Sequence, residues 1–163
     1  MTEIVDLWPD EIKVEKMITP VTILRQQASL LGKKTKNIVQ GKVEDAKGEL
    51  SINPFNYVFH IVAPALNNYQ YRLFKVSYGV SLYPLEMDIE IEIRNEIPSR
   101  FFKTKTINRI RYEFAYANSE DDFLEILRTI FNSTKVMHII SVLLSQSDPS
   151  YDPSLKEEIS QIR

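Results

Sequence analysis

A strict alternation between Leu85 and Ile93 constrains the fold of this chain more than any other stretch. Odd positions there are apolar, and the even positions are the carboxylates Glu86, Asp88, Glu90 and Glu92. Because successive side chains of a strand point to opposite faces, the pattern predicts a strand with one apolar and one acidic face. The rest of the chain must bury the odd face and neutralise the even one.

A second alternating stretch, residues 101–116, offers a basic counterpart. Its even face carries aromatic and aliphatic side chains, and its odd face carries Lys103, Lys105, Arg109 and Arg111. Opposite charges directly across an antiparallel pair contribute roughly 0.2–1 kcal/mol each. We therefore predict that residues 85–93 and about 106–116 are paired antiparallel strands.

Further elements precede the acidic strand. Thr19 as N-cap and Pro20 at the first helical position predict a helix over residues 20–31, which Gly32 is placed to end. From Asn37 onward the period changes to two. It predicts a strand, a turn at 45–48, a returning strand of roughly residues 50–63 and a third strand over 69–78. In the third strand, simple alternation places Tyr71 and Leu73 on one face of the strand and Phe74 on the other face.

Two helices are predicted in the C-terminal third. Asn118-Ser119 caps the first, and Asn132-Ser133 separates it from a second helix over about residues 134–145. The second helix is apolar except for a stripe of His138, Ser141 and Ser145. A helix this apolar is typical of a core helix or of half an oligomer interface.

This order of elements predicts a two-layer α+β domain over residues 1–147. Its antiparallel sheet would be a meander of four or five strands, packed by an N-terminal helix and two C-terminal helices. Residues 148–163 are predicted to be a linker followed by a short docking helix or a flexible tail. Residues 1–18 fit a strand or a short helix equally well, and we expect Trp8 to pack on the domain.

Composition narrows the classes of function. The net charge of −2 gives no electrostatic case for nucleic acid or anionic membranes, and the absence of cysteine excludes disulfides and thiolate metal sites. The N-terminus lacks the layout of a signal peptide, and no apolar segment is long enough to span a bilayer. We therefore expect a cytoplasmic protein without membrane contact. The four glycines are isolated, which argues against a nucleotide-binding loop.

The acidic stripe has two interpretations. Alternate carboxylates on one strand could bind a divalent cation, as in a nuclease-like metal-dependent hydrolase using Glu86, Asp88, Glu90 or Glu92. Alternatively they form a solvated face paired with basic residues, which is the more common meaning of such charge patterns. If the basic residues of 100–111 formed an open patch instead, a nucleic-acid binder would be a third hypothesis.

A contact surface is predicted from a few aromatic and polar residues. Tyr69 and Tyr71 come at the start of a strand, where they can be partly exposed, with Arg72 beside them and His138 on the polar stripe of the last helix. Neither histidine has the spacing of a catalytic or metal-binding pair. We therefore expect a non-catalytic protein without a cofactor, an accessory module that binds a protein partner or itself through its sheet or terminal helix.

Overall fold

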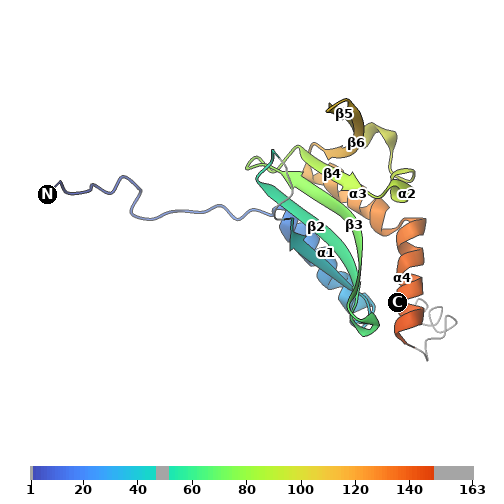
Figure 1. Ribbon diagram of the computed structural model, residues 1–163. Coiled ribbons are helices and arrows are strands. Elements are labelled where there is room, and N and C mark those ends of the chain that lie inside the picture. Colours follow the sequence, from blue (N-terminus) through green and yellow to red (C-terminus); the bar gives the residue numbers. More distant parts are fainter. Residues whose placement is uncertain (1, 47–51, 149–163) are drawn as a thin grey trace.

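Six antiparallel strands form one sheet in the computed structural model, which describes residues 2–46 and 52–148 (Figure 1). The strand order is β1-β2-β3-β4-β6-β5. The strands are β1 (Gln40–Asp45), β2 (Phe55–Ala63), β3 (Tyr69–Tyr78), β4 (Leu85–Ile89), β5 (Phe102–Ile107) and β6 (Ile110–Ala117). The predicted α+β class is confirmed, with six strands instead of four or five. The last hairpin also departs from a meander, because β6 pairs with β4 and leaves β5 at the edge.

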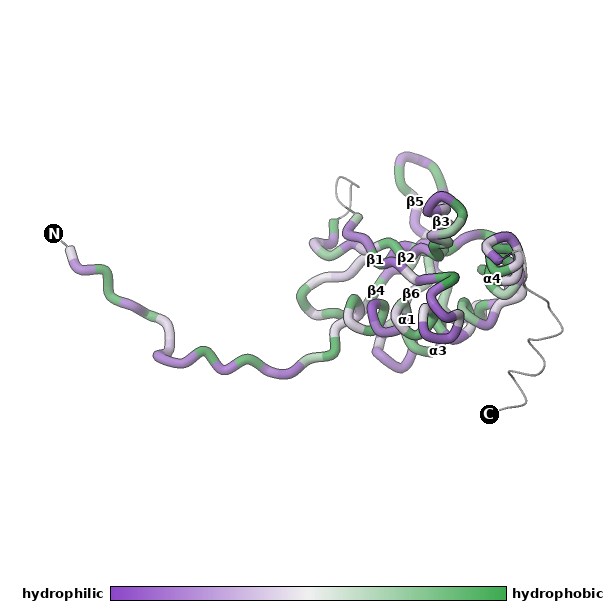
Figure 2. Tube along the Cα trace, turned by 90° about the horizontal axis from the view of Figure 1, so that it is seen from below, coloured by the Kyte–Doolittle hydropathy of each residue, from purple (hydrophilic) through white to green (hydrophobic). Residues whose placement is uncertain are grey.

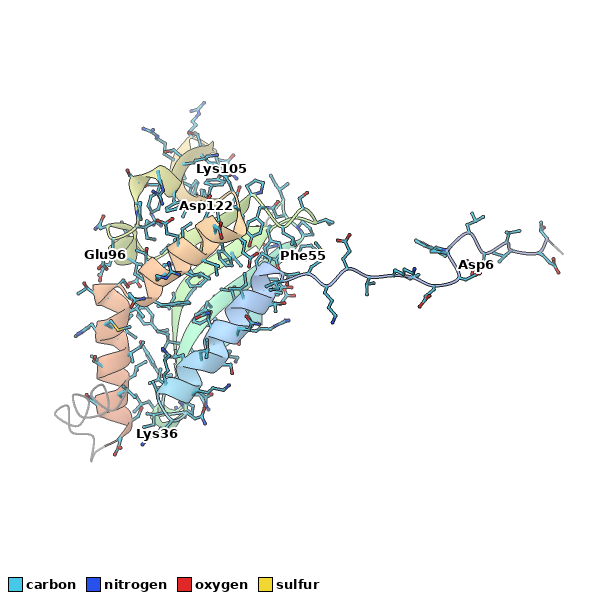
Figure 3. The ribbon with its side chains drawn as sticks, turned by 180° about the vertical axis from the view of Figure 1, so that it is seen from behind. Asp6, Lys36, Phe55, Glu96, Lys105 and Asp122 are labelled. Carbon is cyan, nitrogen blue, oxygen red and sulfur yellow. The ribbon has the colours of Figure 1, made fainter. Side chains whose placement is uncertain are left out.

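The helices lie on one face of this sheet. Figure 1 shows α1 (Pro20–Lys34) and α3 (Glu120–Phe131) behind the strands, and Figure 3, seen from behind, shows them in front, with α4 (Thr134–Ser147) to one side. The short elements are α2 (Ile91–Arg94) and the 3-10 turns η1 (Pro64–Leu66) and η2 (Ser99–Phe101). The opposite face of the sheet has no helix over it among the described residues, and we call it the open face.

The apolar core lies between the sheet and the helices. Phe59 of β2 stacks on Phe74 of β3 at 5.3 Å between ring centroids, and Phe131 of α3 contacts both rings. Next to Phe59, α1 approaches β1 so closely that a Cβ on Gly41 would lie 2.5 Å from Ala28 Cα and 3.0 Å from Phe59 Cζ. Leu85, Met87 and Ile89 of β4 are buried, which confirms the apolar odd face of the acidic strand.

Side-chain caps set the helix boundaries much as predicted. Thr19, Ser119 and Ser133 each accept a hydrogen bond from a backbone N–H in the first turn of α1, α3 and α4. The prediction that Gly32 ends α1 was wrong. The helix continues to Lys34, and the left-handed residues that reverse the chain are Lys36 (φ 51°) and Asn37 (φ 62°).

The acidic strand is shorter than its alternation predicted. It ends at Ile89, and residues 91–94 turn into α2, which buries Ile93 and leaves Ile91 68% exposed. Its paired register with β3 ends at Ile89 opposite Phe74, next to the point where the register of β3 with β2 shifts between Phe74 and Arg72. Glu90 and Glu92 therefore do not continue the acidic face of β4.

The basic stretch is a hairpin of two strands. Asn108 (φ 51°) and Arg109 (φ 66°) form the turn, and Lys103 and Lys105 lie opposite Phe114 and Tyr112. Residues directly opposite each other share a face, so both lysines lie with the aromatic residues and not on a face of their own. Arg111 pairs with Thr106 on the other face. The predicted basic face was therefore wrong, although β6 does pair antiparallel with β4.

The N-terminal segment does not pack on the domain. Residues 2–18 are exposed throughout and run away from the sheet as an extended chain (Figure 1). Trp8 is 75% exposed, so the prediction that it packs on the domain was wrong. The predicted C-terminal tail, apart from Asp148, and part of the predicted turn at 45–48 lie outside the described residues.

Candidate functional site

A one-residue irregularity in β3 determines which side chains face the helices. Tyr57 pairs with Val76 and Phe59 with Phe74, but His60 pairs with Arg72 and Ile61 with Tyr71. The shift moves the helix-facing positions of β3 from even to odd numbers, as a β-bulge does. Tyr69 and Tyr71 therefore lie on the same face as Phe74 and Val76, contrary to the simple alternation that the sequence suggested.

The helix α4 lies over this part of the sheet and is fixed at its N-terminus. Ser133 is 1% exposed, and its Oγ accepts a hydrogen bond of 3.2 Å from Val136 N. Glu96 accepts hydrogen bonds of 3.1 Å from the backbone N and the hydroxyl of Thr134. Lys135 forms an ion pair of 2.8 Å with Glu92 of α2. These contacts hold the first turn of α4 against the segment that follows β4.

A pocket of about 370 Å³ lies between β3 and α4. Its lining is mostly apolar and comes from three elements: Leu66 of η1, Tyr69 and Tyr71 of β3, and His138, Ile139, Val142 and Leu143 of α4. Tyr69 and Val142 are 48% and 42% exposed, so the pocket opens to the surface. An open apolar pocket with a few polar groups is the usual form of a binding site.

Tyr71 connects the pocket to Glu90, a carboxylate that does not itself line it. The Tyr71 hydroxyl donates a hydrogen bond of 2.5 Å to Glu90 Oε1, while Glu90 Oε2 is buried with no hydrogen-bond partner among the described residues. Burial, and then the hydrogen bond to the Glu90 carboxylate, raise the pKa of the Tyr71 phenol well above its ordinary value. The phenol therefore stays neutral and serves as a hydrogen-bond donor.

Of the four residues predicted as a contact surface, three line this pocket: Tyr69, Tyr71 and His138. Arg72 does not, because the next residue of a strand points to the other face. It lines a separate pocket of about 250 Å³ with Asp88, Glu90 and Arg94. In that pocket Arg94 Nε donates a hydrogen bond of 2.6 Å to Ile89 O and lies 3.5 Å from Asp88.

Each of the four carboxylates of the acidic stretch contacts a different partner. Lys105 pairs with Glu86, Arg94 with Asp88, Tyr71 with Glu90, and Lys135 with Glu92. Within residues 2–46 and 52–148, no group of three or more histidine, aspartate or glutamate side chains is placed to hold a metal ion. This arrangement gives the metal-dependent alternative no support.

The other histidine lies on the open face of the sheet. His60 Nδ1 is 3.9 Å from Glu44 Oε2 and has no hydrogen-bond partner among the described residues. Burial lowers the pKa of His60, and the neighbouring Glu44 carboxylate opposes this shift. His60 and His138 belong to opposite faces of the sheet, so they do not form one site.

The sequence pattern does not single out several of the pocket residues. Leu66, Ile139, Val142 and Leu143 were expected only as part of a turn or of a generally apolar helix. The exposed position of Val142 beside the predicted stripe of His138 and Ser141 is the signal that could have located the pocket. The bulge that turns Tyr71 toward α4 has no signal of its own in the sequence.

Comparisons of the chain with protein-family models, with curated proteins and with solved structures find no match. None of the described helices combines the length and apolarity that a membrane crossing requires.

Proposed function

We propose that this protein is a non-catalytic binding module that holds an apolar side chain of a protein partner in the pocket between β3 and α4. The observation that carries the proposal is the composition of the pocket. Its walls are a tyrosine pair from the sheet and three aliphatic side chains from α4, and it opens at Tyr69 and Val142. The partner would thus contact both the sheet, through β3, and the terminal helix α4.

The size and chemistry of the pocket suit one anchor residue. Full burial of a leucine, phenylalanine or methionine side chain contributes roughly 1.5–3 kcal/mol. Protein interfaces commonly depend on a few such anchors in well-packed pockets, surrounded by polar contacts. His138, which is exposed on α4 at the rim, is placed to make one of those polar contacts.

The polar groups near the pocket serve structure better than catalysis. The Tyr71 phenol is a poor base because its raised pKa keeps it protonated, and its proton is donated to Glu90. The Glu92 carboxylate is paired with Lys135. These contacts connect β3, α2 and α4, so they make the pocket rigid, and a preformed pocket costs less to bind.

A selection from a displayed random-peptide library against the full chain tests the proposal. We expect enriched peptides to share a large apolar residue. Val142→Lys should weaken their binding at least about tenfold, because it puts a charge into the pocket mouth. Met137→Lys is the matched control, since Met137 lies on the same helix, has the same 42% exposure, and does not line the pocket.

Two results would overturn the proposal. One is a selection that enriches no sequence above background. The other is a set of peptides whose binding is lost equally in both lysine variants, or only in Met137→Lys, since that places the contact elsewhere on α4. Thermal unfolding of both variants shows whether each retains the fold.

A further inference from the structure

Residues 2–18, here called the N-terminal arm, expose an unusual amount of apolar side chain. Ile4, Leu7 and Val14 are 98%, 90% and 84% exposed, and Trp8 is 75% exposed. Figure 2 shows hydrophobic and hydrophilic residues interspersed along the arm as it leaves the domain. These side chains are available for burial against a partner.

The arm is also acidic. It contains five acids, Glu3, Asp6, Asp10, Glu11 and Glu15, against two lysines, a net charge of −3. Its backbone is extended, and Ile12 and Val14 alternate with charged residues as they would in a strand. A segment with these properties is suited to pair with the edge of a sheet whose charge is positive.

The β5 edge has the complementary charge. The hairpin of β5 and β6, residues 102–114, contains four basic residues against the single acid Glu113, a net charge of +3. It also exposes apolar side chains beside Lys105, namely Ile107 at 49%, Ile110 at 56% and Tyr112 at 41%. Lysine on an edge strand disfavours pairing with strands of other chains in general. An acidic strand is the exception, because its charge is opposite to that of the lysines.

Charge distinguishes this edge from the other one. β1 forms the opposite edge of the sheet, and its single basic residue Lys42 is outnumbered by Glu44 and Asp45. An acidic arm would be repelled there. In β5, both charged residues are lysines: Lys105 already forms an ion pair with Glu86 of β4, and Lys103 is left to attract an added acidic strand.

The backbone of β5 has positions free to accept a strand. Ile107 and Ile110 flank the two-residue turn, and the pair that flanks such a turn is hydrogen-bonded. Hydrogen-bonded and non-hydrogen-bonded pairs then alternate along the ladder. Thr104 and Thr106, which lie opposite Glu113 and Arg111, therefore direct their backbone N–H and C=O groups away from β6.

We propose that the N-terminal arm of one copy of this chain adds as an extra strand to the β5 edge of a second copy. A second copy fits better than the arm's own domain, because Figures 1 and 3 show the arm running away from the side of the domain that carries Lys105. Reciprocal exchange of two arms closes a symmetric dimer. This surface is separate from the pocket between β3 and α4, so it does not rest on the proposed function.

Light scattering of the full chain across a range of concentration and salt tests the exchange. We expect a dimer at low salt that dissociates as salt screens the opposite charges. Lys103→Glu with Arg111→Glu should raise the dimer dissociation constant roughly tenfold or more. Lys33→Glu with Lys34→Glu, an equal change of charge on exposed residues at the end of α1, should leave it unchanged. Adding Asp10→Lys and Glu11→Lys to the hairpin variant should restore the dimer.

A backbone test separates strand addition from attraction between charges. Thr104→Pro removes one outward N–H of β5 and no ladder hydrogen bond to β6, so it should weaken the dimer while the domain stays folded by circular dichroism. Titration of a peptide of residues 2–18 into the isotope-labelled full chain should perturb the amides of residues 103–107.

Specific outcomes would overturn this proposal. A chain that remains monomeric at all concentrations and salt conditions would show that the arms are not exchanged. A dimer that survives the hairpin variant but is lost in Val142→Lys would place the contact at the pocket. The proposal would also be contradicted if the peptide perturbed only amides of α4. A further contradiction would be a monomeric chain whose hairpin amides respond only to a single-stranded oligonucleotide.

Discussion

The Tyr71 hydroxyl donates a hydrogen bond of 2.5 Å to Glu90, which joins the start of β3 to the N-cap residue of α2. Tyr71→Phe removes the hydroxyl donor, so the partly buried Glu90 carboxylate loses a hydrogen bond that offsets the cost of its burial. We expect the free energy of unfolding to fall by about 1–2 kcal/mol in urea denaturation. Tyr69→Phe, at a side chain that is 48% exposed, is the matched control. Equal losses in the two variants would contradict this role for the hydroxyl.

The close approach of α1 to β1 depends on Gly41. Gly41→Ala would place a Cβ 2.5 Å from Ala28 Cα and 2.7 Å from Ala28 Cβ, so the helix must move. We expect a loss of about 3 kcal/mol in the free energy of unfolding. Gly79→Ala adds a Cβ with nothing within 4 Å and should change stability by less than about 0.5 kcal/mol. A tolerated Gly41→Ala would show that the two layers are not in tight contact there.

Lowering the pH should reduce the free energy of unfolding of the domain because of His60. Burial lowers the pKa of this imidazole in the folded protein below its ordinary value of 6.5. As the pH falls below 6.5, the unfolded chain binds a proton that the folded chain resists, so the free energy of unfolding decreases. His60→Gln should flatten this decrease between about pH 7 and pH 5, and His138→Gln, on an exposed side chain, is the control. An unchanged slope in His60→Gln would assign the acid sensitivity to other groups.

The Lys105–Glu86 ion pair is the link between the basic hairpin and the acidic strand. Glu86 also accepts a hydrogen bond of 3.3 Å from the Tyr116 hydroxyl, and the hydrogen bond to Glu86 raises the pKa of Lys105. The side chains are 41% and 24% exposed, so the interaction is partly screened. A double-mutant cycle with Lys105→Met and Glu86→Gln should give a coupling of about 0.5–1 kcal/mol that shrinks in high salt. A coupling of zero would mean that the pair does not stabilise the domain.

The sequence predicted the layers of this fold because those layers are set by patterns of many residues. The apolar odd face of the acidic strand is a pattern repeated over several residues. The caps at Thr19, Ser119 and Ser133 are local signals, because each depends only on the few residues around it. The turn at Asn108 and Arg109 was missed because it contains no glycine, although both residues have positive φ. Without that turn, residues 101–116 have the alternation of a single strand with a basic face.

The candidate site was predicted in composition but not in arrangement. Tyr69, Tyr71 and His138 line one pocket, whereas Arg72 was separated from them by the alternation of the strand. The apolar residues of α4 were visible as a class, but apart from the place of Val142 next to the polar stripe, the sequence does not indicate which of them open the pocket and which lie beneath. Those positions depend on how α4 is anchored through Glu96 and Lys135, which are contacts distant in sequence.

The register shift in β3 makes the pocket depend on how the strands pair as well as on side-chain identity. If Leu73 were taken into regular pairing, it would lie opposite His60, and each residue before it would move by one position along β2. The two tyrosines would then exchange faces with Gln70 and Arg72 without a single substitution among them. The same sequence thus encodes an apolar pocket in one register and a polar one in the register one residue away.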